Sequence, residues 1–256
     1  MSEDHLLYRV AEKVAYFTIN RQQQRNALSR DAVSLFLKYL AEAEKDENVS
    51  VILITGAGEK AFCAGADLTS AAAEDAAEGI GNYARLLKRL AGYPKPVIAR
   101  INGLCMAGGM GIMLACDIVI ARDDAQFGTP EVNVGLFPMM IGALIYRNVL
   151  RKRAMEMVLL GEKINAAQAQ EMGLLTRAVA PQSLDGEVDG VLKRLTQKSP
   201  IGIKIGKQAF YAMADMPFED AVDFLCEKFR QVAATDDARE GITAFFEKRK
   251  PVFKGK

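Results

Sequence analysis

The sequence predicts an α/β protein, with a mostly parallel sheet and helical crossovers followed by a helical C-terminal extension. Two observations support this fold class. Up to about residue 140, short apolar runs alternate with amphipathic stretches, which is the order expected of parallel strands joined by helices. Beyond that point, helical patterns follow one another as far as Phe246, with one short strand candidate at 176–179.

The predicted strands of the N-terminal part lie at 14–19, 51–55, 97–101 and 118–121. The run VILIT at 51–55 is apolar throughout and precedes Gly56, which is typical of a strand covered on both faces. We find no internal repeat and no linker between independent domains.

Three helices are predicted between these strands. The helix at 31–44 follows Ser29, a residue type that caps helices well. A longer helix is expected at 70–91 and ends at Gly92, before two prolines. A short buried helix is expected at 108–115.

The charge balance and the single histidine narrow the possible functions. The chain has 33 Lys and Arg against 32 Asp and Glu, a formal net charge of +1, so no nucleic-acid partner is expected. His5 is the only histidine and lies in a polar N-terminal stretch. Ser-His-Asp and Cys-His catalysis and His-rich metal sites are therefore not expected. We expect no metal and a carboxylate as the group that transfers protons.

The cysteines and apolar runs predict a cytoplasmic protein without a membrane span. The four cysteines form no CxxC pair and lie among apolar residues, as reduced and buried thiols do. The acidic N-terminal stretch contains no apolar signal-peptide region. Only 103–121 approaches the length of a membrane helix, and its glycines and Asp117 fit a buried helix followed by a strand better.

The stretch from Gly56 to Ala61 formally matches the dinucleotide-binding pattern G-x-G-x-x-A. That pattern needs a helix directly after the glycines, so that the helix N-terminus meets the pyrophosphate. Here the next residues read AFCAGAD, with another glycine where the helix should run. We interpret the segment as a turn after a strand, which argues against a nicotinamide-dependent dehydrogenase.

Two loops of small residues follow successive predicted strands, CAGAD at 63–67 and NGLCMAGG at 102–109. Both emerge at the carboxyl ends of neighbouring parallel strands, where open α/β sheets bind ligands. One interpretation is that two backbone N–H groups converge there on one oxygen, helped by the dipole of a helix that begins near Gly108. The other is tight packing of a helix on the sheet, which also requires small residues. The loops alone leave both open.

Glu131 is the candidate proton carrier. It follows Pro130 within the largely apolar stretch FGTPEVNVGLF, and apolar surroundings would raise its pKa and suit it to proton transfer. The alternative is a glutamate at the start of a helix, which the helix dipole favours. The spacing leaves this choice open as well.

Together these residues resemble the enoyl-CoA hydratase/isomerase family, the crotonase superfamily, over nearly the whole chain. The matching segments are NAL at 26–28, AFCAGADL at 61–68, 102–109, CDIVIA at 116–121, FGTPE at 127–131, Gly161, 166–169 and EMGL at 171–174. The resemblance implies a crotonase-like (ClpP/crotonase) fold, a spiral of repeated ββα units with a helical C-terminal extension. It also implies an acyl-CoA substrate, so coenzyme A is part of the substrate and no separate cofactor is expected.

The resemblance further implies roles for individual residues. The N–H groups of Ala66 and Gly108 would hold the thioester oxygen, and Glu131 would move the proton. The residues implied in binding coenzyme A are Arg25, Ala64, Ala66, Asp67, Leu68, Gly108, Phe229 and Lys248, the last two from the C-terminal helices and in a neighbouring subunit. For Asp67, capping of the following helix is the structural alternative.

At Gly111 the sequence differs from the hydratases that it resembles. Those enzymes hold the attacking water between two glutamates; the second is present as Glu131, whereas the first falls on Gly111. One base beside an oxyanion hole suffices to take a proton from C2 of a 3-enoyl-CoA and return it at C4, so isomerisation is favoured. Hydration by Glu131, alone or with a carboxylate at 67–80, and a non-catalytic acyl-CoA-binding protein remain as alternatives.

The division of the chain follows from the same resemblance. We expect 1–195 to form the core that contains the active site. The helical region 196–256 is expected to join copies of the chain into a homotrimer or hexamer.

Overall fold

Two sheets form the centre of the molecule in the computed structural model, which describes residues 4–67 and 76–256. The larger sheet has the strand order β1-β2-β3-β5-β7-β10 and is parallel except for β1, which pairs antiparallel with β2. Its strands are β1 (Leu6–Ala11), β2 (Val14–Ile19), β3 (Val51–Gly56), β5 (Val97–Ile101), β7 (Ile118–Arg122) and β10 (Arg177–Val179). The smaller sheet has the order β4-β6-β8-β9 and consists of β4 (Ala61–Cys63), β6 (Leu104–Met106), β8 (Gln126–Gly128) and β9 (Ile164–Asn165).

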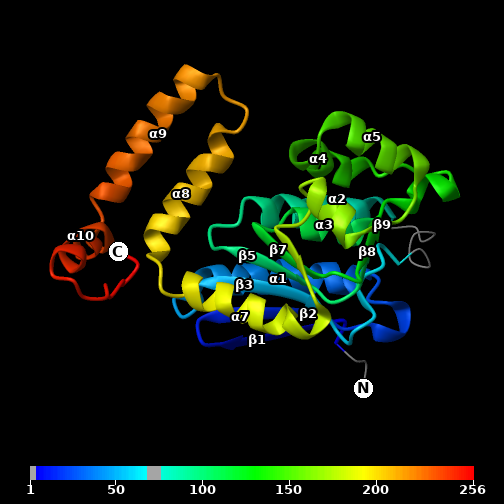
Figure 1. The fold of residues 1–256 in the computed structure, drawn as a ribbon, viewed down its shortest axis with the longest axis horizontal. Coiled ribbons are helices and arrows are strands. Elements are labelled where there is room, and N and C mark those ends of the chain that lie inside the picture. The colour runs from blue at the N-terminus through cyan, green and yellow to red at the C-terminus, as the bar shows by residue number, and fades with distance from the viewer. Residues whose placement is uncertain (1–3, 68–75) are drawn as a thin grey trace.

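The helices surround these sheets and then leave them (Figure 1). They are α1 (Arg30–Lys45), α2 (Ala76–Ala91), α3 (Gly108–Leu114), α4 (Met139–Asn148), α5 (Arg151–Leu160), α6 (Ala166–Glu171), α7 (Leu184–Leu195), α8 (Pro200–Met213), α9 (Phe218–Ala233) and α10 (Asp236–Phe246), with short 3₁₀ segments η1 (Gln22–Gln24), η3 (Pro130–Val134) and η4 (Pro181–Ser183). Figure 1 shows α8 and α9 as an adjacent pair that extends away from the sheets, with α10 and the C-terminus at the end of the pair where α8 begins. No helix in the described part of the chain is both long and apolar enough to span a membrane.

The chain repeats one backbone unit that consists of a long strand, a short strand and a helix. β3, β4 and α2 form one such unit, β5, β6 and α3 form the next, and β7 and β8 begin a third. The long strands build the large sheet, and the short strands build the small one. These units are the ββα spiral that the resemblance implies. The sequence itself shows no repeat because the repetition lies in the backbone path, while the side chains of the units differ.

The large sheet is covered on both faces, as the apolar run of β3 predicts. Ile52 and Ile54 point into the larger core cluster, which includes Phe36 of α1. The alternate residues Val51 and Leu53 point to the other face, where α7 packs on them. Burial on both faces explains why the run from Val51 to Ile54 carries no polar residue.

Most long elements confirm the sequence-based predictions. β2 and β5 match their predicted ranges, β3 and β7 are one residue longer, and the side chain of Ser29 accepts a hydrogen bond from Ala32 as the N-cap of α1. After Gly58 the chain enters β4 and no helix begins, so the structure confirms that the G-x-G-x-x-A pattern is a turn. The predicted start of the helix at 70–75 lies outside the described residues.

The strand predicted at 176–179 is present as β10, whereas several other strands, most of them short, were not predicted. The segments 63–67 and 102–109 are expected to be loops, yet β4 ends at Cys63 and β6 occupies three residues of the second segment. β1 and β8 are also absent from the prediction. Strands of three residues are too short to show an alternating pattern, and they form here because neighbouring short strands pair with one another.

Polar contacts fasten the C-terminal helices to the sheet and to each other. The Nζ of Lys207 in α8 donates to Oδ2 of Asp117 at 2.5 Å and to the carbonyl of Lys95 at 3.1 Å. The buried carboxylate of Asp237 in α10 accepts from the hydroxyl of Ser199 and from the N–H groups of Lys254 and Gly255. The C-terminal tail is thereby folded back onto the beginning of α8 and α10.

Candidate active site

The two small-residue loops meet in space at the residues that the sequence singles out. A methyl group added at Gly108 would lie 3.5 Å from the backbone nitrogen of Ala66, and one added at Gly65 would lie 3.6 Å from the backbone nitrogen of Gly108. The loops are brought together because β4 and β6, which precede them, pair in parallel. The structure therefore places Ala66 and Gly108 next to each other.

The hydrogen bonds around Ala66 direct its N–H group away from the neighbouring backbone. Leu28 donates to the carbonyl of Gly65 at 2.8 Å, and Asp67 donates to the carbonyl of Leu28 at 2.9 Å. Because the peptide between Gly65 and Ala66 is trans, its N–H points opposite to that carbonyl and away from Leu28. Among the described residues, this N–H has no acceptor, and Ala66 is exposed.

The N–H of Gly108 points out of the beginning of α3. The carbonyl of Ala107 accepts from Met110 at 2.9 Å and is thus turned into the helix, so the N–H on the same trans peptide is turned outward. Ala107 has φ 47° and ψ −123°, a conformation that residues with a Cβ rarely adopt and that costs of the order of 1–3 kcal/mol. The fold keeps this strained residue directly before the outward N–H group.

The glycines of α3 separate the two interpretations of the loops. A methyl group at Gly109 would lie 2.5 Å from the carbonyl oxygen of Cys63, which is backbone and cannot yield easily. A methyl group at Gly108 would meet nothing closer than 3.4 Å. Gly109 therefore serves the close packing of α3 on β4, whereas Gly108 keeps open the space between two backbone donors. The packing interpretation is confirmed for Gly109, and the space at Gly108 stays open as the other interpretation requires.

Glu131 has the environment of a proton carrier. It lies in η3 directly after Pro130, and its Oε2 is buried without a hydrogen-bond partner among the described residues. Burial raises the pKa of this carboxyl group, although a hydrogen bond to its own backbone N–H opposes the shift. Glu131 does lie in the first turn of a 3₁₀ segment, as the alternative interpretation expects, but a glutamate held there only by the helix dipole would keep its carboxylate in solvent.

A tyrosine that the sequence analysis did not single out covers the position of the missing glutamate. A methyl group at Gly111 would lie only 2.2 Å from the hydroxyl oxygen of Tyr83 and 2.5 Å from Cγ2 of Ile141. Tyr83 belongs to α2, and its hydroxyl donates to the carbonyl of Gly108 at 2.6 Å. Burial is the main reason that its pKa lies well above the usual range, and the charge of Glu131 contributes. The phenol therefore remains protonated.

Helical spacing on α2 was the one sequence signal for Tyr83. Tyr83 and Leu87 are one turn apart and both reach Gly111, so they share the face of α2 that packs on α3. That spacing marks a residue as facing inward. It does not tell which part of another helix the residue will cover.

Two buried asparagines hold the segment between β3 and β4 in place. Asn26 donates to the carbonyls of Ala57 and Ala61, at 3.0 and 2.7 Å. Asn102 donates to the carbonyl of Gly58 at 2.6 Å, to that of Ala61 at 3.1 Å and to that of Gly56, and it accepts from the N–H of Gly56. These two residues of the recognised motifs are structural and fix the path that leads to Ala66.

The first loop is tied to the N-terminal segment. The carboxylate of Asp67 pairs with Arg21 at 2.8 Å, and both side chains are largely buried. Ala64 donates its N–H to the carbonyl of Arg25 at 3.0 Å, which places the exposed Arg25 beside the loop. Leu68 lies outside the described residues. The residues directly after Asp67, where a helix capped by Asp67 would begin, lie outside them as well.

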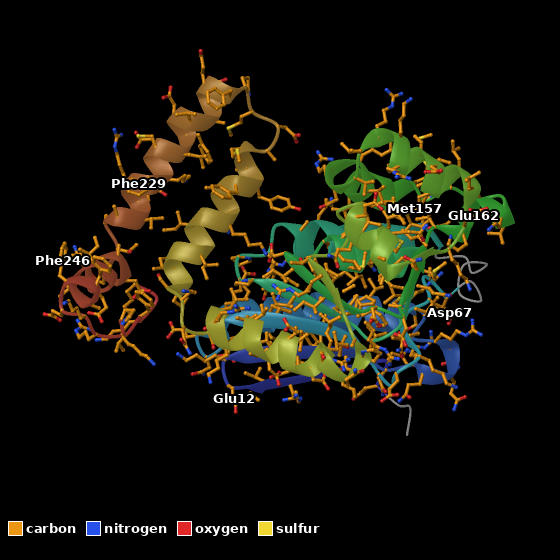
Figure 2. The ribbon with its side chains drawn as sticks, viewed as in Figure 1. Glu12, Asp67, Met157, Glu162, Phe229 and Phe246 are labelled. Atoms are coloured by element: carbon orange, nitrogen blue, oxygen red, sulfur yellow. The ribbon has the colours of Figure 1, made fainter. Side chains whose placement is uncertain are left out.

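Phe229 and Lys248 do not lie with these loops within one chain. Figure 2 shows Phe229 in α9 at one end of the molecule and Asp67 at the other. Phe229 is 72% exposed, and Lys248 follows α10, two residues after Phe246. A contact of either residue with a ligand at Ala66 would require a second copy of the chain.

No metal site lies in the described ranges 4–67 and 76–256, where no group of three or more His, Cys, Asp or Glu side chains is close enough to bind an ion.

Comparisons with known proteins agree over the whole length. The sequence profile described as enoyl-CoA hydratase/isomerase matches residues 9–256. The chain is 35% identical over 244 residues to the short-chain-enoyl-CoA hydratase of Clostridium acetobutylicum, covering 93% of each chain. It is 36% identical over 248 residues to the 2,3-dehydroadipyl-CoA hydratase of Escherichia coli, covering 96% of each. The crystal structure of an enoyl-CoA hydratase from Mycobacterium smegmatis matches with a TM-score of 0.94 and 33% identity, covering 98% of this chain and 99% of that one.

Proposed function

The chain belongs to the enoyl-CoA hydratase/isomerase family, the crotonase superfamily, and has the crotonase fold, and we propose that it moves the double bond of a 3-enoyl-CoA to position 2 with Glu131 as its single proton carrier. Members of this family act on thioesters of coenzyme A. The observation that carries the finer proposal is the packing at Gly111. There the space at Gly111 is filled by Tyr83 and Ile141, so no second carboxylate is present at that position.

The backbone donors supply the electrostatic part of this reaction. When a proton leaves C2, negative charge develops on the thioester oxygen. The N–H groups of Ala66 and Gly108 are unpaired within the described protein and fixed before the reaction, so they can accept that charge without reorganisation. In other enzymes, one such donor lowers the barrier by roughly 2.7–4 kcal/mol.

Glu131 supplies the proton transfer. Its carboxylate takes the proton from C2, and the electrons of the C–H bond form a dienolate that extends from the thioester oxygen to C4. The same carboxyl group then returns the proton at C4, so the double bond moves from C3–C4 to C2–C3 with no net loss or gain of atoms. The raised pKa of Glu131 suits both steps, because a group that titrates nearer to neutral pH can accept and release a proton.

Hydration of a 2-enoyl-CoA is the second candidate, and the names of the relatives favour it. Both curated relatives described above are called hydratases. In this chain, however, the position that supplies the second carboxylate in the hydratases it resembles is Gly111, so Glu131 would have to activate the water without a carboxylate at that position. We therefore place hydration second to isomerisation.

The test is the substitution Glu131→Gln, with both activities measured on defined 3-enoyl-CoA and 2-enoyl-CoA substrates. Removal of the base is expected to lower kcat for isomerisation by about 10²–10⁴-fold, the usual contribution of general acid-base catalysis. The control is Glu162→Gln, which changes an exposed glutamate whose carbonyl lies beside Gly128. This control should retain the wild-type rate.

Three results would contradict the proposal. If Glu131→Gln keeps full isomerase activity, Glu131 is not the base. If the wild-type protein hydrates 2-enoyl-CoA faster than it isomerises 3-enoyl-CoA, the second candidate is correct. If calorimetry shows acyl-CoA binding and neither substrate is converted, the chain is a binding protein.

The proposal includes a homotrimer or hexamer in which 196–256 forms the contacts. Large aromatic side chains are exposed on the C-terminal helices, which in one chain have nothing to cover them; those more than 60% exposed are Phe210, Phe218, Phe229, Phe245 and Phe246. In such an assembly Phe229 and Lys248 could reach coenzyme A bound to a neighbouring subunit, near Arg25 and the first loop of that subunit.

A further inference from the structure

We propose that the hydroxyl of Tyr83 determines which reaction this site performs, because it occupies the place of a second carboxylate and keeps an attacking water from being held opposite Glu131. The inference rests on the proposed function, in which Glu131 and the N–H groups of Ala66 and Gly108 do the chemistry. It adds a residue that selects between two reactions on the same thioester.

The space beside Gly111 is closed by three side chains. An added methyl group would lie 2.2 Å from Oη of Tyr83, 2.5 Å from Cγ2 of Ile141 and 3.2 Å from Cδ2 of Leu87. The first two distances are shorter than Cβ contacts found in proteins. A carboxylate on residue 111 therefore has no room while Tyr83 keeps its position.

The Tyr83 hydroxyl is held at this place by the same residue that supplies an oxyanion donor. It donates to the carbonyl of Gly108 at 2.6 Å, and it lies 3.4 Å from a methyl group added at Gly108. The side chain thus reaches from α2 to the first residue of α3, next to the two N–H groups.

The chemical state of Tyr83 prevents it from replacing a glutamate as a base. Its proton is engaged with the Gly108 carbonyl, and burial, with a contribution from the charge of Glu131, keeps the phenol neutral. A neutral phenol cannot take a proton from water. Of these two residues, Glu131 is thereby the one that can act as a base, and a single base is sufficient for isomerisation.

The experiment compares Tyr83→Phe with the wild-type protein. The substitution retains the ring and leaves a space of about one oxygen atom beside the Gly108 carbonyl, which can accept a hydrogen bond from an entering water. We expect the ratio of hydration to isomerisation to rise about tenfold or more, as one polar group in a site commonly changes selectivity by that factor. The KM for either acyl-CoA should change little.

Tyr93→Phe is the matched control. The hydroxyl of Tyr93 also donates to a helix carbonyl, that of Leu40 at 2.8 Å, and its side chain is fully buried. The loss of one buried hydrogen bond should lower Tm in both variants. Only Tyr83→Phe should change the ratio of the two products; equal ratios in the two variants would overturn the inference.

A double-mutant cycle, with Tm as the measured quantity, tests the packing of Tyr83 on Gly111 without an activity assay. Gly111→Ala should lower Tm because its methyl group displaces the Tyr83 hydroxyl, and it should lower Tm less in the Tyr83→Phe background, where that oxygen is absent. Equal effects in both backgrounds would show that Tyr83 does not fill this space and would overturn the inference.

The failures of the two proposals can be distinguished. The rates of the wild-type protein and of Glu131→Gln decide the proposed function, whereas the change of ratio between wild type and Tyr83→Phe decides the role of Tyr83. A protein that isomerises but shows no change of ratio overturns only the latter. A protein that converts neither substrate overturns both.

Discussion

At the scale of single residues, the site depends on backbone groups as much as on side chains. In the proposed mechanism Ala66 and Gly108 contribute N–H groups, so their side chains matter only through the space that they leave open. Glu131 contributes a carboxyl group whose position combines burial with the lack of a partner among the described residues. Each of these properties leads to a measurable prediction.

Gly108→Ala should strongly reduce activity without loss of stability. Its methyl group would make only ordinary contacts, none below 3.4 Å, but would lie 3.5 Å from the Ala66 nitrogen in the space for the thioester oxygen. We expect kcat/KM to fall by about 10²-fold or more, as for the loss of an oxyanion donor, with Tm maintained.

Gly109→Ala is the contrasting variant. Its methyl group would lie 2.5 Å from the Cys63 carbonyl oxygen, so overpacking should lower the free energy of unfolding by about 1–3 kcal/mol in a urea titration. If Gly108→Ala is the less stable of the two, the division of roles between these glycines is wrong.

The raised pKa of Glu131 makes activity and stability change in opposite directions with pH. Between the ordinary pKa and the raised one, the folded protein binds the proton more tightly than the unfolded chain, so the free energy of unfolding falls as pH rises through that interval. Over the same interval the carboxylate forms and kcat/KM rises. Glu131→Gln does not titrate there, so the stability of wild type relative to this variant should decline with rising pH. A stability difference that increases with pH would contradict this assignment.

At the scale of elements, two successive copies of the same backbone unit bring the two small-residue loops together. In each of two units a long strand leads to a short strand, and the residues after the short strand carry the donor. The short strands are held in register by their pairing and by the asparagines before them. The site is therefore a consequence of two equivalent units lying side by side.

Asn102→Ala should weaken both the fold and the activity. It removes a buried side chain that bonds to the backbone of Gly56, Gly58 and Ala61, and it leaves those groups unsatisfied. We expect a loss of at least roughly 1–3 kcal/mol in the free energy of unfolding, measured with urea. Asn48→Ala is the control, because the exposed side chain of Asn48 contacts only Asp46 and should contribute less than about 0.5 kcal/mol. Equal losses in the two variants would show that Asn102 is not a structural bridge.

At the scale of the whole molecule, the chain is divided between a packed sheet region and an extended helical region. Figure 1 shows the pair α8 and α9 reaching away from the sheets, and the exposed aromatic side chains gather on this region. Lys207 fastens α8 to the sheet through Asp117. The helices are thereby held in an orientation that leaves their apolar faces available to another copy.

Light scattering after size exclusion should give a mass of about three or six times 27.9 kDa. The double substitution Phe245→Glu/Phe246→Glu places charges on side chains that are 78% and 77% exposed, and it should reduce the mass to that of one chain. Leu7→Glu, on the edge strand β1, should leave the assembly unchanged. A wild-type protein that elutes as a monomer would contradict the proposed oligomer.

Local patterns were sufficient for the long elements. Alternation and apolar runs predicted β2, β3 and β5 closely, and Ser29 marked the beginning of α1. The short strands of the small sheet were missed because they have too few positions to show a period, and the pairing of β4 with β6 joins segments about 40 residues apart.

By itself, the sequence determined the order of the elements, the two loops of small residues, the absence of a glutamate at Gly111 and the candidacy of Glu131. Only the tertiary structure decided that the N–H groups of Ala66 and Gly108 lie together and that Tyr83 covers Gly111. The physical reason is the distance along the chain over which each kind of interaction acts. Periodicity and capping depend on neighbours within one or two turns, whereas the contact of α2 with α3 depends on how two separate helices pack on the same sheet.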